Sequence, residues 1–172
     1  MKRCLVIIAL SAWLAAPAHA QVDAAREAEL TAIYQSAQDD FLDKRYTEAL
    51  PQFEQVAREL GSPNAQLYVA RCLRELGRRV EAQAAMQRAV EMASAHADRE
   101  KFEPPRAAAA AELAEIEALL GQVAVVVDDP PAGLRIEVAG RALGSLDERV
   151  FVEPGTVRVD ALAPGQPLSR QE

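Results

Sequence analysis

Cysteine is scarce in this sequence, which contains only Cys4 and Cys72. Cys4 belongs to an N-terminal segment that we expect to be removed, so Cys72 would remain alone and no intramolecular disulfide could form. Because Cys72 lies inside a helical pattern, we interpret it as a buried packing thiol. A redox-active or partner-linked cysteine is the alternative.

Histidine is equally scarce, and the usual signatures of catalysis are missing. His19 is part of a candidate cleavage site, and His96 has no second metal ligand at a suitable spacing. No glycine-rich phosphate loop follows a strand, and no Ser/His/Asp set can be assembled. We expect Glu112, Glu115 and Glu117 to form the solvated face of a helix. The sequence therefore predicts a protein that is not an enzyme, with no catalytic, cofactor-binding or metal-binding residues.

Basic residues are outnumbered, with 19 Lys and Arg against 26 Asp and Glu. Removal of a leader containing Lys2 and Arg3 would leave 17 basic and 26 acidic residues, a net charge near −9. A surface this acidic repels phosphate backbones and anionic lipids. Nucleic acid is therefore not expected as a partner.

Long hydrophobic runs are also missing, apart from the uncharged residues 4–16 near the N-terminus. As a helix these 13 residues would span about 20 Å, which is shorter than the hydrocarbon core of a bilayer. Lys2 and Arg3 precede them, and Pro17 and the small-x-small triplet Ala18-His19-Ala20 follow. This order is typical of a bacterial signal peptide spanning residues 1–20 and cleaved after Ala20. We expect a periplasmic or secreted protein with no transmembrane segment after cleavage; an uncleaved anchor is the alternative.

Residues 23–121 have the period of α-helices. Apolar side chains recur at steps of three and four, as in Leu30, Ile33 and Tyr34. A break is expected at residues 43–45, where charged residues interrupt the apolar pattern. Further breaks are expected at Gly61-Ser62-Pro63, at Gly77 and at Pro104-Pro105, where glycine, proline or a capping serine interrupts it. We therefore expect five short helices, stacked antiparallel.

The second and fourth of these helices have similar sequences. Ala49, Phe53 and Val56 correspond to Ala82, Met86 and Ala89, each pair 33 residues apart, a period typical of helix-turn-helix solenoids. With Tyr46-Thr47-Glu48-Ala49-Leu50 at the turn, residues 30–97 resemble the tetratricopeptide-repeat (TPR) family. The sequence departs from the family at Arg79, which stands where Tyr46 stands in the first copy, and at Lys44, which replaces the turn glycine. The number of repeats therefore stays open.

The resemblance implies a scaffold that binds proteins or peptides on the concave face made by the first helix of each pair. Projecting the groove positions of the family onto this chain selects Tyr34, Gln38, Phe41, Arg71 and Arg74. Aromatic rings and guanidinium groups would suit an acidic or extended peptide. The alternative is that Tyr34 and Phe41 belong to the core.

Residues 122–172 change to the period of β-strands. Four strands are expected, at 123–127, 134–138, 150–152 and 156–162, separated by turns rich in proline and glycine. This order resembles the PEGA domain, with residues 130–133 as a permuted form of its name motif and Glu153-Pro154-Gly155 as its later turn. The fold class expected for the whole chain is α+β: a TPR-like antiparallel α-solenoid over residues 21–121, followed by a small antiparallel β module.

The β module is expected to be incomplete, because only five residues follow the turn at Pro164-Gly165-Gln166-Pro167. Either the chain is a fragment of a longer protein, which we favour, or a partner or a second copy supplies the last strand through the C-terminal edge.

These expectations together predict an exported, non-catalytic scaffold or adaptor of the bacterial cell envelope that binds a protein or peptide. One alternative is a structural spacer whose β module contacts the cell wall or a surface layer. A more remote alternative is an enzyme that modifies the cell wall.

Overall fold

The computed structural model describes residues 18–165 and 169–171. Residues 1–17 of the expected leader lie outside this range, so cleavage after Ala20 stays a prediction. Within the part of the chain that the structure describes, no helix is both long and apolar enough to cross a membrane.

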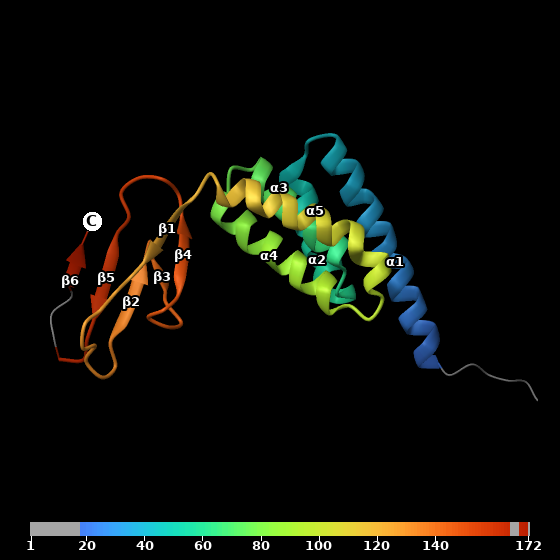
Figure 1. Cartoon of the computed structure of the whole chain (residues 1–172). Coiled ribbons are helices and arrows are strands. Elements are labelled where there is room, and N and C mark those ends of the chain that lie inside the picture. Colours follow the sequence, from blue (N-terminus) through green and yellow to red (C-terminus); the bar gives the residue numbers. More distant parts are fainter. Residues whose placement is uncertain (1–17, 166–168, 172) are drawn as a thin grey trace, which may run out of the picture.

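Five α-helices form the first part of the chain and pack on one another in sequence order (Figure 1). Their bounds are Ala18–Leu42 (α1), Tyr46–Leu60 (α2), Pro63–Glu75 (α3), Arg79–Ala95 (α4) and Arg99–Glu117 (α5). A small β module follows, so the α+β fold class is confirmed.

The turns before α2 and α4 have the same backbone geometry, 33 residues apart. Lys44 and Gly77 both lie in the left-handed region, with φ of 61° and 77°. The next residue closes each turn: the Arg45 N–H donates to the Asp40 carbonyl at 2.8 Å, and the Arg78 N–H donates to the Leu73 carbonyl at 2.9 Å. These bonds satisfy carbonyl groups that a helix end leaves unpaired. Lys44 thus occupies the glycine position of the turn without altering it, and the helix pairs repeat in structure as well as in sequence.

The connection between α2 and α3 is confirmed in detail. Gly61 lies in the left-handed region with φ of 59° and ends α2. The Ser62 hydroxyl oxygen accepts a hydrogen bond from the Ala65 N–H at 3.3 Å, and Pro63 is the first residue of α3. A capping side chain and a proline in the first turn both favour a helix start.

The predicted helix break at Pro104-Pro105 is wrong, because both prolines lie inside α5. The helix begins earlier, after Asp98, whose carboxylate accepts a hydrogen bond from the Lys101 N–H at 3.1 Å. Each proline removes one backbone hydrogen bond, but Phe102 is buried and the alanine-rich turns that follow favour a helix. Packing and capping therefore outweigh the local cost.

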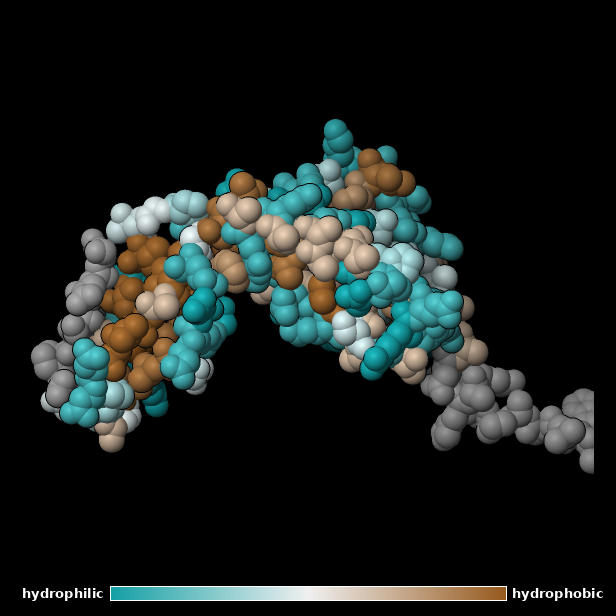
Figure 2. Space-filling model, in the orientation of Figure 1, coloured by the Kyte–Doolittle hydropathy of each residue, from teal (hydrophilic) through white to brown (hydrophobic). Residues whose placement is uncertain are grey.

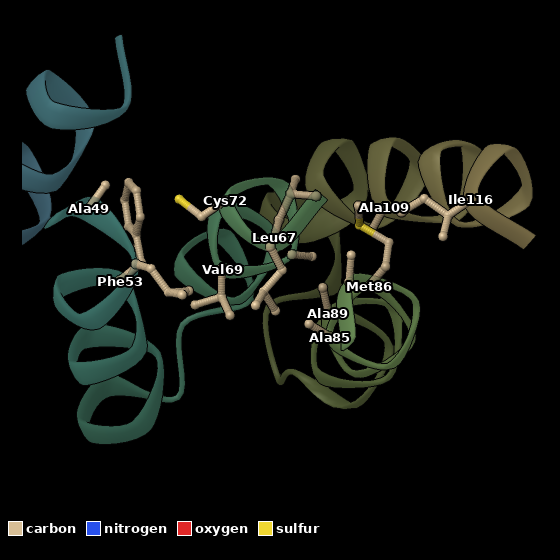
Figure 3. Packing of buried hydrophobic residues seen from close by; sticks show 14 of the residues in the cluster. Ala49, Phe53, Leu67, Val69, Cys72, Ala85, Met86, Ala89, Ala109 and Ile116 are labelled. Atoms are coloured by element: carbon tan, nitrogen blue, oxygen red, sulfur yellow. The ribbon is translucent and has the colours of Figure 1, made fainter. Parts of the chain in front are cut away.

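The repeated positions lie in the core of the helical part. Ala49, Phe53, Ala82 and Met86 have no exposed surface, and alanines at the crossings let the helices approach closely (Figure 3). Cys72 also lies in this core, and its burial raises the pKa of the thiol to about 12. The reactive thiolate is therefore suppressed, as a packing role requires.

The β module consists of two antiparallel sheets. Gly121–Ala124 (β1) pairs with Arg149–Val152 (β4), and the second sheet has the order β3-β2-β5-β6, formed by Arg141–Ala142, Arg135–Val138, Val159–Leu162 and Ser169–Gln171. Ile136, Val138, Val150 and Val152 are buried together. Figure 2 shows hydrophobic residues of this module gathered on one visible face.

The four expected strands exist, but the structure shortens three of them. The first strand ends at Ala124 and the last begins at Val159, because the hydrogen-bonded ladders stop there. The turn at Pro164 does lead into a further strand, β6, which pairs with β5 from Val159↔Gln171 to Ala161↔Ser169. Whether the module is completed by more chain or by a partner stays a prediction.

Within the described residues, an ion pair links the helical part to the β module. The Arg79 guanidinium, in the first turn of α4, lies 3.2 Å from the Glu153 carboxylate that follows β4. Both side chains are about half exposed, so the pair contributes little to stability.

Candidate functional site

The candidate groove residues come from two helices, α1 and α3. Tyr34, Gln38 and Phe41 lie on successive turns of α1, and Arg71 and Arg74 lie on α3. All five side chains are partly buried, so each combines packing with some exposure to solvent.

Tyr34 and Phe41 are joined by a residue that the sequence analysis missed, Tyr68 on α3. The ring centroid of Tyr68 lies 6.1 Å from that of Tyr34 and 5.2 Å from that of Phe41, both edge to face. Tyr68 also stacks on buried Phe53 with centroids 4.8 Å apart. The alternative weighed for Tyr34 and Phe41 is therefore partly correct: both rings pack against the helical core. The signal that could have found Tyr68 is its position one helical turn before Arg71.

Burial affects the chemistry of this aromatic cluster (Tyr34, Phe41 and Tyr68). It raises the pKa of the Tyr34 hydroxyl to about 12, so Tyr34 stays neutral. The guanidinium carbon of Arg71 lies 5.3 Å from the centroid of the Tyr68 ring, within the range of a cation–π contact. The Arg71 guanidinium thus places a positive charge next to the aromatic cluster, on the side of α3.

Arg71 binds the carboxylate of Glu112 on α5. Nε and Nη2 of Arg71 donate to Oε1 of Glu112 at 3.0 and 2.5 Å. Only 24% of the Arg71 side chain and 17% of the Glu112 side chain are exposed. The hydrogen bonds to Glu112 are the main cause that raises the pKa of Arg71 above its ordinary value. The expectation that Glu112 belongs to a solvated face is therefore wrong.

Arg74 binds the other oxygen of the same carboxylate. Its Nη1 donates to Oε2 of Glu112 at 2.8 Å, while Nε and Nη2 donate to Oε1 of Glu75 at 3.1 and 3.0 Å. The two guanidinium groups are thus matched by two carboxylates. An acidic ligand would have to compete with Glu112 for them, a constraint that the sequence analysis did not foresee.

The structure therefore brings four of the five predicted residues into one network: Tyr34 and Phe41 through Tyr68, and Arg71 and Arg74 through Glu112. Gln38 lies on the same helix between Tyr34 and Phe41 and is half-buried. We name this set, with Tyr68 and Glu112, the α1–α3 groove, after the binding groove that the TPR resemblance implies at these positions.

Other candidates for chemistry are accounted for by structural contacts. The His96 ring lies 4.2 Å from that of Phe102, and its Nδ1 accepts a hydrogen bond from the Asp98 N–H. Glu117 accepts a hydrogen bond from the Gln83 side chain at 2.9 Å, and Glu115 is exposed as expected. Among the described residues, no cluster of three or more His, Cys, Asp and Glu side chains is placed to hold a metal ion.

The fold defines the class of this protein as a repeated helix-turn-helix module followed by a two-sheet β module. Comparisons with protein-family models, with curated proteins and with solved structures give no match to the chain. Its function must therefore be argued from its own residues.

Proposed function

We propose that this chain is an exported, non-catalytic scaffold of the bacterial cell envelope that binds an extended segment of a protein or peptide in the α1–α3 groove. The observation that carries the proposal is the aromatic cluster beside the Arg71–Arg74–Glu112 network. It presents partly exposed rings beside fixed hydrogen-bonding groups, on helices whose positions are set by a repeated core. Rigid aromatic and arginine side chains are the residues that most often dominate binding energy.

Membership of the TPR family is part of this proposal for the helical part. Its support is the 33-residue repeat of buried positions and the matching turns at Lys44 and Gly77. A PEGA-like identity for the β module is also part of the proposal, and its support is the strand order and the turn at Glu153-Pro154-Gly155. In this proposal the β module positions the helices, and the groove binds the partner.

The network indicates what kind of ligand would fit. Because Glu112 and Glu75 together already neutralise Arg71 and Arg74, a ligand carboxylate gains little unless Glu112 moves. An extended backbone with apolar or aromatic side chains can instead pack on Tyr34, Phe41 and Tyr68 and leave that network intact. We therefore favour an extended peptide segment with an apolar anchor, and an acidic group on it adds affinity only by displacing Glu112.

The groove can be tested by reversing the most exposed of its charges. In Arg74→Glu, we expect capture of the partner from an envelope extract to fall by about tenfold, since a new carboxylate would repel Glu112 and disturb the groove surface. The matched control is Arg88→Glu, an exposed residue of α4 outside the groove. The measurement is quantitative mass spectrometry of proteins retained by the immobilised chain. Equal capture by both variants would remove the groove from the proposal, and capture of no protein by the unaltered chain would favour the spacer alternative.

Export predicts a defined new N-terminus. Because Ala18 and Ala20 flank His19 in the small-x-small pattern, we expect the exported chain to begin Gln21-Val22-Asp23. N-terminal sequencing of the protein from the periplasm or medium checks this. Replacing Ala20 with a bulky residue such as Phe should leave the precursor uncut. If the unaltered protein is instead found at full length in the inner membrane, the prediction is wrong.

A further inference from the structure

The chain just after β1 runs beside the β4 ladder without joining it. The pairing between β1 and β4 ends at Ala124↔Arg149, and three consecutive valines follow at residues 125–127. No backbone–backbone hydrogen bond joins these valines to another residue of the part of the chain that the structure describes. On the side of β4, a groove of about 480 Å³ separates them from Leu146 and Asp147. Their N–H and C=O groups are therefore available to pair with another strand.

This segment keeps the alternation of a strand although it is unpaired. Val123, Val125 and Val127 are half-buried and pack toward the core of the β module, whereas Ala124 and Val126 face outward. Val126 is 85% exposed, which makes it the most exposed large hydrophobic residue among those described. An apolar strand edge of this kind is a template for pairing with another chain.

We propose that a second copy of this chain pairs here, with residues 124–128 of the two copies aligned antiparallel about Val126. Residues directly opposite each other in an antiparallel pair lie on the same face. Centring on Val126 therefore places Val125 opposite Val127 of the second copy, both toward the cores, and the two Val126 side chains against each other outside. Among the described residues, β1 is hydrogen-bonded to β4 alone, so its other edge has no partner strand and is where we place the second copy.

Charge complementarity supports this occupant and this register. Asp128 of the second copy would lie opposite Ala124, whose partner on the other side is Arg149. Ala124 and Arg149 are both exposed, and they share the outer face of the sheet. The small alanine leaves room for the long Arg149 side chain to reach the incoming carboxylate, and the two-fold symmetry forms the same pair twice. A shift of the centre to Val125 would place Asp128 opposite Gln122 instead and lose both pairs.

The turn that follows limits the contact to a short ladder. Asp129 lies in the left-handed region with φ of 53°, and Pro130 cannot donate a backbone hydrogen bond. The pairing must therefore end at Asp128. The interface stays small, so we expect a reversible dimer whose population depends on concentration.

Analytical ultracentrifugation of the whole chain tests the proposal. We expect a monomer–dimer equilibrium, and Val126→Lys should raise the dimer dissociation constant by at least about tenfold, because it places like charges directly opposite each other. The matched control is Ala132→Lys in the exposed turn nearby, which should leave the constant unchanged. Since Val126 is exposed, both variants should keep the same circular dichroism spectrum. A chain that stays monomeric at every accessible concentration, or a folded Val126→Lys variant that dimerises normally, would overturn the proposal.

A charge exchange tests the register. Asp128→Arg and Arg149→Asp should each weaken the dimer, and the double variant should recover most of the loss, because it restores the pair with reversed charges. No recovery would overturn the register.

A cross-link tests the edge itself. Two Val126→Cys copies should form a disulfide under mild oxidation, because opposite residues of an antiparallel pair bring their Cα atoms close enough for one. Cys4 is replaced by serine in every variant, and Cys72 can stay because it is buried. The control is Ala132→Cys, which should not cross-link. Arg170→Pro, which disrupts β6, should leave cross-linking unchanged. If Arg170→Pro abolishes the dimer and Val126→Cys does not cross-link, the C-terminal edge is the interface and the proposal fails.

Discussion

Replacing Phe53 with alanine is expected to lower the free energy of unfolding of the helical part by about 3–5 kcal/mol. Phe53 has no exposed surface, and its ring contacts three others, those of Tyr34, Phe41 and Tyr68. Truncation would lose the burial of a large apolar side chain and leave a cavity at the centre of the aromatic cluster. The expected loss is a large part of the free energy of unfolding of a typical domain, which is about 5–15 kcal/mol.

The measurement is urea unfolding followed by circular dichroism at a wavelength dominated by helices. The control is Leu42→Ala, which removes a large apolar side chain that is 77% exposed and should change stability by less than about 0.5 kcal/mol. If the two variants unfold at the same urea concentration, Phe53 is not the centre of the helical core. A loss of partner binding in Phe53→Ala at a temperature where it remains folded would show that the cluster also shapes the groove.

Reversing the charge of Arg71 should have the second largest effect. In Arg71→Glu, a new carboxylate faces Glu112, a partly buried group that would keep only Arg74 as its partner. Breaking a buried ion pair typically costs about 3–5 kcal/mol, and partial exposure of both groups reduces the expected loss here to about 2–3 kcal/mol. From the sequence, reversing Arg71 and Arg74 together is expected to weaken partner binding and to leave helix content intact, with a structural Arg71 that pairs with a carboxylate on a neighbouring helix as the alternative. The structure shows such a pair between Arg71 and Glu112.

A charge exchange separates this ion pair from other effects of the substitution. Adding Glu112→Arg to Arg71→Glu should recover at least half of the lost stability, because the pair is restored in reverse, although Arg74 then faces a like charge. Arg88→Glu is the control for a charge reversal on an exposed helix surface and should be nearly neutral. Thermal unfolding of the unaltered chain, Arg71→Glu, Glu112→Arg and the double variant gives the coupling energy. A stable Arg71→Glu variant, or no recovery in the exchange, would show that the contact with Glu112 does not support the fold.

Several features of this protein follow from short stretches of sequence. Gly61-Ser62-Pro63 ends one helix and starts the next as expected, because capping depends on groups within a few residues of each other. The repeat of Ala49, Phe53 and Val56 at 82, 86 and 89 predicts the same buried stripe twice, because a helix that buries one face must space its apolar residues by its own period.

Tertiary packing decided what these local rules could not. Two prolines break a helix by local rules, yet α5 continues through Pro104 and Pro105 because Phe102 is buried and the helix packs on α3 and α4. Glu112 belongs to a polar stripe by its spacing, but its partner Arg71 lies 41 residues earlier in the chain. That pair exists only because α5 folds back against α3.

The same division applies to the two candidate interfaces. The resemblance to the TPR family selects Tyr34, Phe41, Arg71 and Arg74 as groove positions, but Tyr68 joins the aromatic residues only when α1 and α3 pack side by side. In the β module, a run of β-branched residues predicts a strand over residues 123–127. The pairing stops at Ala124 because β4, its partner strand, begins at Arg149. The sequence around residues 123–127 does not show where that distant strand begins.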